Sequence, residues 1–273
     1  MPLISILIPA YNHQNYVTQT LDSILDDNFK NKEIIIINDG STDNTDKVIK
    51  SWITKNRDKI NIIYKSRENR GLTKTLNELL ALSSGLYITA VASDDYLLDK
   101  GLEERYQYLL MHPEKYAVFA DCVVVDRSNH QIYSSGLFEL RNANKNRLSC
   151  DEGIKKEFIS NFAVPGSVLM VKRDYYAQFG KYNEEMYMED FDLYLKFASK
   201  NLIGFLDEKV SAYRLHDANM SSVNNQDFIK LLEDSKKTLL LHFNNFHGFN
   251  KLLLLKEVIK FSIRIGMHKI KGL

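Results

Sequence analysis

Two short, nearly uninterrupted apolar runs constrain the fold of this chain most strongly. The first covers Leu3–Ile8 and ends at a proline, and the second covers Glu33–Ile37 and ends in the turn sequence Asn-Asp-Gly-Ser. Runs of this kind, bounded by turn residues, are typical of strands that are buried on both faces of a parallel sheet. Two further runs, Ile60–Tyr64 and Leu86–Ala92, predict a third and a fourth strand.

Amphipathic segments separate these predicted strands. Helices are predicted over residues 15–27, 42–57 and 72–82, because apolar side chains recur there at helical spacing. Strands and helices that alternate in this way predict an α/β domain with a mainly parallel sheet and right-handed crossovers.

The second half of the chain is less regular than the first. Strands are expected there at residues 116–125 and 167–171, and helices at residues 149–161 and 189–199. An exposed loop is expected at residues 134–146. From Asp227 onward the pattern predicts two helices that are separated near residues 244–250. We therefore expect an α/β domain over residues 1–222 and a helical C-terminal extension over residues 223–273.

The composition argues against several classes of protein. Lys and Arg number 36 and Asp and Glu number 35, whereas a general nucleic-acid binder usually carries a strong basic excess. Cys122 and Cys150 are the only cysteines and form no C-x-x-C pair, which favours reduced thiols in the cytoplasm. The N-terminal apolar run is too short for a secretory signal, and no run of about 18 apolar residues follows. We expect a cytoplasmic protein without a nucleic-acid partner.

Polar side chains follow each of the four predicted strands, at the edge where parallel α/β sheets bind their ligands. These polar segments are residues 9–12, 38–41, 66–71 and 93–95. The aromatic ring among them can stack on a base, and a carboxylate can accept from a ring N–H or a ribose hydroxyl. Adjacent carboxylates can hold a hard divalent cation that bridges phosphate oxygens. The pattern predicts a nucleotide-diphosphate site without a glycine-rich loop.

The common motifs for dinucleotide binding, P-loops, nucleophile elbows and zinc proteases are absent. Instead, six segments in order resemble the family 2 inverting glycosyltransferases with the GT-A fold. These segments are Ile4–Asn12, Ile34–Thr45, Glu68–Ile88, Ala92–Asp95, Tyr187–Ala198 and Tyr213–Ser221. Together they span about four-fifths of the chain. The resemblance implies a GT-A fold, that is, a mainly parallel Rossmann-like sheet flanked by helices, followed here by the helical extension.

The resemblance also implies a UDP-sugar donor, held mostly by residues that follow the first three strands. Asp39 would lie toward the uracil ring. The competing interpretation is an ordinary turn or helix-capping aspartate, although Asp43 is better placed to cap the next helix. The expected donor-binding residues are Pro9, Tyr11, Asn12, Asp39, Asn69, Gly71 and Asp94.

A divalent metal, Mn²⁺ or Mg²⁺, is implied by the acidic pair after the fourth strand. Asp94 and Asp95 stand where the family carries its metal-binding acids, and both are expected metal ligands, with Asp94 as the direct ligand and Asp95 as a close second. His216 resembles a late histidine that reaches the metal or the diphosphate. The other histidines, including His13, have no comparable sequence context, and we interpret them as incidental.

The catalytic base implied by the resemblance is Asp190, in the pair Glu189-Asp190 that opens a predicted helix. Acids are also favoured in the first turn of a helix by its dipole, and both roles can hold together. Asp190 would take the proton from an acceptor hydroxyl as that hydroxyl attacks the sugar with inversion. The expected acceptor is a glycan or a lipid-linked glycan in cell-surface polysaccharide biosynthesis.

Two other functions remain open from the sequence. A nucleotidyltransferase shares a nucleotide-binding α/β half, but it would usually show a glycine-rich basic stretch after its first strand, which this chain lacks. A catalytically inactive nucleotide-sugar-binding scaffold is the other alternative. The joint presence of Asp94, Asp95 and Asp190 argues against it.

The last 23 residues carry six basic residues and one acid, Glu257. An apolar stripe is expected on one face of this helical segment. It consists of Leu252, Leu255, Ile259, Ile263 and Ile270. Such a basic amphipathic helix suits peripheral contact with an anionic membrane at the cytoplasmic face. Packing on the domain or on a second subunit of a homodimer explains the pattern equally well.

Overall fold

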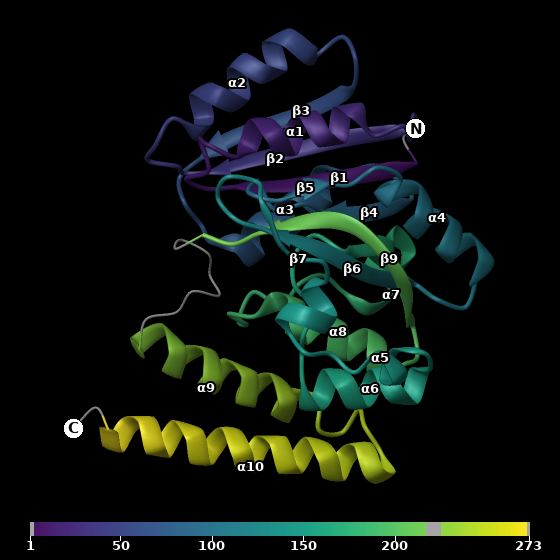
Figure 1. The fold of residues 1–273 in the computed structure, drawn as a ribbon, viewed down its shortest axis with the longest axis vertical. Coiled ribbons are helices and arrows are strands. Elements are labelled where there is room, and N and C mark those ends of the chain that lie inside the picture. Colours follow the sequence, from purple (N-terminus) through teal and green to yellow (C-terminus); the bar gives the residue numbers. More distant parts are fainter. Residues whose placement is uncertain (1–2, 217–224, 272–273) are drawn as a thin grey trace.

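The computed structural model describes residues 3–216 and 225–271, which form a mixed nine-stranded sheet flanked by helices (Figure 1). The strands are β1 (Ile4–Ala10), β2 (Lys32–Asp39), β3 (Asn61–Arg67), β4 (Tyr87–Ala90), β5 (Tyr96–Leu97), β6 (Ala117–Val125), β7 (Gln131–Tyr133), β8 (Leu169–Lys172) and β9 (Ile203–Arg214). The helices are α1 (Val17–Asp26), α2 (Thr45–Asn56), α3 (Leu72–Leu82), α4 (Gly101–Met111), η1 (Gly136–Leu140), α5 (Lys145–Leu148), α6 (Asp151–Ser160), α7 (Arg173–Phe179), α8 (Glu189–Ser199), α9 (Asn225–Leu241) and α10 (Gly248–Lys271).

The order of strands in the sheet is β3-β2-β1-β4-β8-β6-β9-β5, with β7 added beside β6. The first four strands are parallel to one another, as the alternation of strands and helices predicts. Beyond β4 the sheet is mixed, because β8 runs antiparallel to both β4 and β6 while β6 and β9 are parallel. The parallel half brings the carboxyl ends of β1, β2, β3 and β4 to one edge.

Both faces of the sheet are covered, which explains why its strands are apolar without alternation. In β1, Ile6 and Ile8 face one core with α1 and α2, whereas Leu7 faces the other core with α3. The same division holds in β2, where Ile34 and Ile36 face the first core and Ile35 and Ile37 the second; all four are fully buried. Successive side chains of a strand point to opposite faces, so both must be apolar.

The C-terminal helices α9 and α10 lie antiparallel at the end of the molecule that is farthest from β3 (Figure 1). Leu239, Phe246 and Leu254 belong to the same hydrophobic cluster as α6 and α8. The predicted break near residues 244–250 is confirmed, since α9 ends at Leu241 and α10 begins at Gly248. The predicted domain boundary between residues 222 and 223 lies outside the described residues. Within the described ranges, no helix has the length and apolar character that crossing a bilayer requires.

The prediction of an exposed loop at 134–146 is wrong for residues 135–137, which are buried, whereas residues 141–142 and 144–146 are exposed as predicted. The chain there forms η1, a single π-helical turn, in which Gly136 and Leu137 are buried. The cause is Asp121 at the middle of β6, which is fully buried and needs donors. It accepts hydrogen bonds from the Leu137 N–H (2.9 Å) and the Ser135 hydroxyl (2.6 Å), and these bonds draw the segment inward.

Candidate active site

Hydrogen bonds join the loop after β1 to the loop after β2. The Asn12 N–H donates to Ser41 Oγ (2.9 Å), and the Thr42 N–H donates to Asn12 Oδ1 (2.8 Å). Asn12 adopts the left-handed backbone conformation (φ 54°), which asparagine tolerates better than most residues. The ring of Tyr11 is 46% exposed, and Pro9 is the partner of Ile37 in the β1–β2 register. The loop therefore offers an open aromatic face on a fixed backbone.

Asp39 fastens the loop after β2 to the loop after β3. Its buried carboxylate accepts hydrogen bonds from the N–H groups of Arg70 (2.8 Å) and Gly71 (3.0 Å), and it forms an ion pair with Arg67. Asn69 Oδ1 accepts from the same Gly71 N–H (3.1 Å). Asp39 thus brings the predicted donor-binding residues Asn69 and Gly71 to its own strand end.

Asp43, and not Asp39, accepts a hydrogen bond at the N-terminus of α2. The sequence predicts this role for Asp43. Asp43 Oδ1 accepts a hydrogen bond from the Thr45 N–H (2.9 Å), and its other oxygen accepts from the Gln14 N–H (3.1 Å). The bonds from Thr45 and Gln14 lower the pKa of Asp43, although burial opposes them. Asp39 therefore does not cap α2.

Gly40 allows the loops after β2 and β3 to approach each other. Its φ is +73°, and a Cβ atom built on it would lie 2.5 Å from the Asn69 backbone nitrogen. Only glycine meets both conditions without strain. The close approach of the two strand ends thus requires the glycine of the turn sequence Asn-Asp-Gly-Ser.

Replacing Gly40 with alanine should destabilise the protein more than replacing Gly71 with alanine. Both glycines have positive φ, a backbone conformation that destabilises the folded state by about 1–2 kcal/mol when an L-residue adopts it. Only Gly40 has backbone atoms in the way; nothing lies within 4 Å of a Cβ at Gly71. Urea unfolding of the two variants measures the difference. Equal losses of stability would show that the close approach of the two loops contributes nothing.

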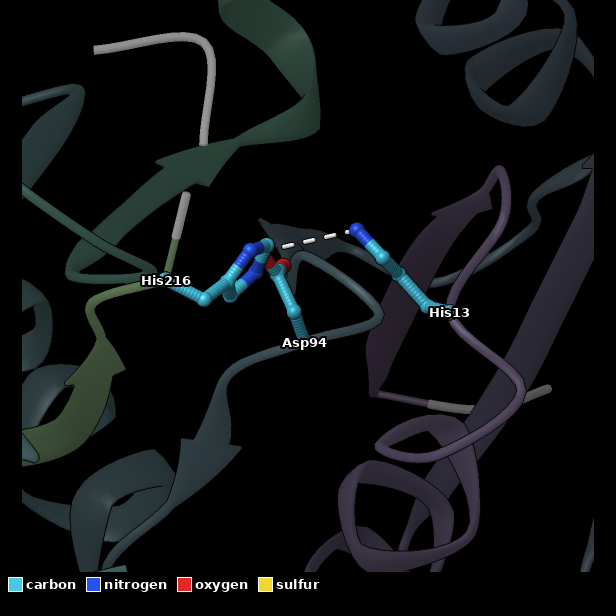
Figure 2. Close-up of side chains that lie close together, drawn as sticks. All are labelled: His13, Asp94 and His216. Carbon is cyan, nitrogen blue, oxygen red and sulfur yellow. Dashed lines mark hydrogen bonds and ion pairs between the residues drawn. The ribbon is translucent and has the colours of Figure 1, made fainter. Parts of the chain in front are cut away.

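Three side chains from distant parts of the chain converge at the carboxyl edge of the sheet (Figure 2). His13 follows β1, Asp94 follows β4 and His216 follows β9. Asp94 Oδ2 lies 3.0 Å from His216 Nε2 and 3.6 Å from His13 Nε2. One ligand atom from each of the three residues lies within 4.8 Å of the others. The side chains point toward one another across the gap between their loops (Figure 2).

Contacts outside the cluster hold His13 and the loop that carries Asp94. His13 Nδ1 lies 2.7 Å from Ser93 Oγ, which leaves Nε2 toward Asp94. The guanidinium of Arg214, at the end of β9, is buried and donates from Nε to the Asp94 carbonyl oxygen (2.9 Å). The Thr20 hydroxyl of α1 also contacts the carbonyl oxygen of Ser93 (3.0 Å). These contacts position the His13 ring and the backbone of the loop that carries Asp94.

The spacing of the cluster suits a divalent cation. Burial alone would raise the pKa of Asp94, but the hydrogen bond with His216 and the charges of both histidines bring this pKa below its usual value. Burial lowers the pKa of His13, which favours the neutral imidazole. Two atoms about 2.1 Å from one ion, at angles of about 90–120°, lie about 3.0–3.6 Å apart. The observed separations of 3.0 and 3.6 Å fit such an ion.

Asp95 does not join this cluster, in contrast to the expectation that it lies beside the metal. Its carboxylate is turned inward, where Oδ1 accepts from the Arg214 N–H (3.0 Å) and Oδ2 from the Ser167 hydroxyl (2.9 Å). Burial, and then the charge of Asp94, raises the pKa of Asp95 well above its usual value. A carboxyl group whose charged form is disfavoured, and whose two oxygens already accept hydrogen bonds, is a poor metal ligand. Asp95 instead connects β9, and Ser167 two residues before β8, to the Asp94 loop.

His13 is the member of the cluster that sequence reasoning missed. The residue follows a predicted strand end, which is a signal that the sequence contained. Nothing near His13 along the chain reveals its partners, because Asp94 and His216 are brought to it only by the arrangement of β1, β4 and β9 in the sheet.

Glu189 and Asp190 form the first turn of α8, as predicted. Burial, opposed by hydrogen bonds from backbone N–H groups such as that of Phe191, raises the pKa of Asp190 to about 6. Burial and the charge of Asp190 raise the pKa of Glu189 to about 8. At neutral pH the pair therefore holds one proton, on Glu189, and one negative charge, on Asp190.

Helix α9 clamps the segment that carries this acid pair. Asp234 of α9 is buried and accepts a hydrogen bond from the Met188 N–H (2.8 Å), immediately before Glu189. In the first turn of α8, Asp192 Oδ1 lies 2.8 Å from Nε2 of the buried His242, which directly follows α9. The C-terminal helix α9 thus fixes the start of α8.

The segment before α8 is also fastened to α3. Asn77 donates to the Tyr182 carbonyl oxygen (3.0 Å) and accepts from the Tyr182 N–H (3.1 Å). The neighbouring Leu76 is buried in the core, as expected for a packing residue. Since α3 begins directly after Gly71, the helix connects the loop fastened by Asp39 to the segment that leads to Asp190.

Comparison with known proteins identifies the family. Residues 5–180 match the model of the glycosyl transferase family 2. An uncharacterized glycosyltransferase of Rickettsia typhi is 29% identical over 226 residues, which cover 80% of this chain and 65% of that protein. The chondroitin synthase of Pasteurella multocida is 40% identical over 103 residues, 38% of this chain and 10% of the synthase. The chain thus spans 65% of the Rickettsia relative and much less of the synthase.

Solved structures confirm the predicted GT-A fold. S. aureus TarS 1–349 in complex with UDP-GlcNAc superimposes with a TM-score of 0.68 and 19% identity, over 95% of this chain and 71% of that one. The mannosyltransferase PcManGT of Pyrobaculum calidifontis, in complex with GDP-Man and Mn²⁺, gives a TM-score of 0.67 and 15% identity, over 94% and 69% of the two chains. The family match covers more than half of the sequence, and the chain belongs to the family 2 glycosyltransferases.

Proposed function

We propose that this protein is a metal-dependent inverting glycosyltransferase. It transfers a sugar from a UDP-sugar to a hydroxyl of a glycan or lipid-linked glycan in cell-surface polysaccharide biosynthesis. The observation that carries the proposal is the cluster of His13, Asp94 and His216 at the ligand-binding edge of a family 2 fold. The free thiols of Cys122 and Cys150 support a cytoplasmic location.

In this proposal the cluster binds the diphosphate of the donor, and the neighbouring loops bind its nucleoside. Asp94, His13 and His216 would hold a divalent cation, which when bound neutralises charge on a diphosphate. The nucleoside would lie over the loops after β1, β2 and β3. The residues proposed to contact it are Pro9, Tyr11, Asn12, Asp39, Asn69 and Gly71. TarS, which shares the fold, binds UDP-GlcNAc, and this supports a UDP-sugar.

Asp190 is the proposed general base. The ionised carboxylate takes the proton of the acceptor hydroxyl while the hydroxyl oxygen bonds to the anomeric carbon. The bond from that carbon to the phosphate oxygen breaks, and its electron pair leaves with UDP. One displacement inverts the anomeric centre, so no covalent enzyme intermediate forms. Glu189 keeps its proton at neutral pH and leaves Asp190 as the acceptor of the pair.

A panel of sugar donors tests the proposal. The protein is incubated with Mn²⁺ and several UDP-sugars, and with GDP-mannose because PcManGT binds that donor. Release of UDP, increased by added acceptor glycans, is the expected result. Release of pyrophosphate from a nucleoside triphosphate and a sugar phosphate would indicate a nucleotidyltransferase. Donor binding without turnover under all conditions would indicate an inactive scaffold.

Activity should rise with pH through about 6, because only the ionised form of Asp190 accepts a proton. The charge of Asp234 raises the pKa values of Asp190 and Glu189, whereas Arg141 lowers that of Asp190. Replacing Asp234 with asparagine removes a negative charge and should move the acid limb of kcat/KM to lower pH, by up to about 1 unit.

The asparagine at position 234 can still accept the Met188 N–H, so the clamp on α8 is kept. Glu233→Gln is the matched control, because Glu233 is an exposed acid of the same helix that pairs with Lys269. The control should leave the pH profile unchanged. An acid limb that does not move in Asp234→Asn, or moves to higher pH, would contradict the electrostatic role of Asp234.

A further inference from the structure

Helix α10 carries apolar side chains on two opposite faces. The inner face packs on the body of the protein, where Leu254, Val258 and Ile265 are buried. The outer face is a stripe of large apolar side chains, each between 43% and 65% exposed. The outer stripe consists of Phe249, Leu252, Leu255, Ile259, Ile263 and Met267. A soluble surface helix ordinarily needs only the inner face.

The outer stripe is continuous along the helix. Its members are three or four residues apart, and at about 100° per residue they fall on the side opposite to Leu254 and Val258. From Phe249 to Met267 the stripe is about 27 Å long, at 1.5 Å per residue. Helix α10 is the outermost layer at its end of the molecule (Figure 1), and the members of the stripe are exposed while Leu254 and Val258 are buried.

Basic side chains border the outer stripe on both sides. Lys256, Lys260 and Arg264 are four residues apart and follow one border, and Lys251 and Lys269 lie along the other. The acid of this helix, Glu257, is buried on the inner side and accepts from Lys260 (2.9 Å). Lys269 pairs with the exposed Glu233, a contact that contributes little in water. The outer face is thus apolar in its centre and positive at its margins.

We propose that the outer face of α10 binds the surface of an anionic lipid membrane, with the helix lying in the plane of the interface. The apolar stripe enters the boundary between headgroups and acyl chains, and the basic borders contact anionic headgroups. This inference concerns attachment and does not depend on the proposed reaction. A membrane at this face would place the protein where a lipid-linked acceptor is found.

A second copy of the chain fits this face less well. In a two-fold dimer the same patch meets itself, so the basic borders of one helix would oppose those of the other. A stripe one helix wide also offers much less than the about 800 Å² that each partner of a stable complex usually buries. Anionic lipid removes both difficulties, because it supplies opposite charge and an extended surface.

Co-sedimentation of the full chain with lipid vesicles tests the proposal. Vesicles of phosphatidylcholine with about one-third phosphatidylglycerol are compared with vesicles of phosphatidylcholine alone, at low and at high salt. We expect at least a tenfold preference for the anionic vesicles, reduced by salt. The double variant Ile259→Gln/Ile263→Gln and the charge variant Lys256→Glu/Arg264→Glu should each lose at least tenfold in binding. All four side chains are exposed, although the Arg264 guanidinium also lies over the ring of Phe228 in α9 (5.6 Å), so the Ile259→Gln/Ile263→Gln variant is the one that leaves the contacts between α9 and α10 in place.

Leu110→Gln/Met111→Gln is the matched control, because these side chains are exposed on α4, away from α10 (Figure 1). The control should bind vesicles like the unaltered protein. Absence of binding to anionic vesicles, or equal binding by the α10 variants, would overturn the proposal. Sedimentation velocity of the same proteins adds a decisive result. A dimer that Ile259→Gln/Ile263→Gln converts to a monomer, without lipid binding, would assign the stripe to a second copy.

Discussion

Replacing Asp190 with asparagine should reduce sugar transfer by about 10²–10⁴-fold while donor binding remains nearly unchanged. Asparagine keeps the size of the side chain and its hydrogen bond to the Phe191 N–H, which Asp190 Oδ1 accepts at 2.7 Å. It removes only the ability to take a proton. Transfer is measured with a saturating UDP-sugar and an acceptor glycan, and donor affinity by calorimetry. Transfer within about tenfold of the unaltered protein would exclude Asp190 as the base.

The neighbouring acid provides the control for this experiment. Glu189 is buried beside Asp190 and carries a proton at neutral pH, so Glu189→Gln changes little in charge. We expect Glu189→Gln to retain far more activity than Asp190→Asn. Equal losses in both variants would assign the effect to disruption of the first turn of α8.

Loss of folding does not explain the expected defect of Asp190→Asn. The pKa of Asp190 in the folded protein is above its unfolded value, because burial disfavours the charged form. Such a group destabilises the folded state as pH rises from the unfolded pKa through the folded one. A neutral asparagine avoids this destabilisation at pH 7. Thermal unfolding at pH 7 should therefore show a stability equal to or above that of the unaltered protein.

The N-terminal half of the fold could be predicted from the sequence because its signals are local. Buried strands such as β1 and β2 are apolar on both faces, and α1, α2 and α3 show one apolar face each. The helix α8 begins at Glu189 as predicted. In these elements the local pattern and the tertiary packing agree.

The mixed half of the sheet could not be predicted in the same way. The position of β8 between β4 and β6 is fixed by pairing between segments that are far apart along the chain. The sequence pattern does not predict the helices α4 and α7. The length of β9 follows from its pairing with β6 over Ala117–Val125, which no pattern within β9 reveals.

The candidate site, like the fold, could be predicted only where the signal is local in the sequence. Asp94, His216 and Asp190 were predicted as functional residues because each stands in a recognisable motif, and their roles remain predictions. The sequence could not distinguish Asp94 from Asp95, since the two are neighbours of the same type. The structure separates them by their surroundings: Asp94 faces two imidazoles, and Asp95 faces Arg214 and Ser167.

Chelation by EDTA should abolish sugar transfer, and Mn²⁺ should restore it more effectively than Mg²⁺. Two of the three ligand atoms in the cluster are imidazole nitrogens, His13 Nε2 and His216 Nε2. Mg²⁺ strongly prefers oxygen ligands, whereas a mixed set of nitrogen and oxygen atoms suits a transition metal better. Activity is titrated with each ion after chelation, and binding of Mn²⁺ to the protein is measured by its paramagnetic resonance signal. Full activity in EDTA would show that the cluster is structural.

Asp94→Asn and Asp95→Asn form a matched pair that assigns the metal to one carboxylate. Asp94→Asn removes the ionised ligand and should weaken Mn²⁺ binding by at least about tenfold, with a comparable loss of UDP-sugar affinity. Asp95→Asn should keep Mn²⁺ affinity, because burial already raises the pKa of Asp95 and an amide can bond to both Arg214 and Ser167. Loss of Mn²⁺ binding in Asp95→Asn alone would return the ligand role to Asp95. The resonance signal measures Mn²⁺ binding directly, so this result holds whether or not the protein transfers a sugar.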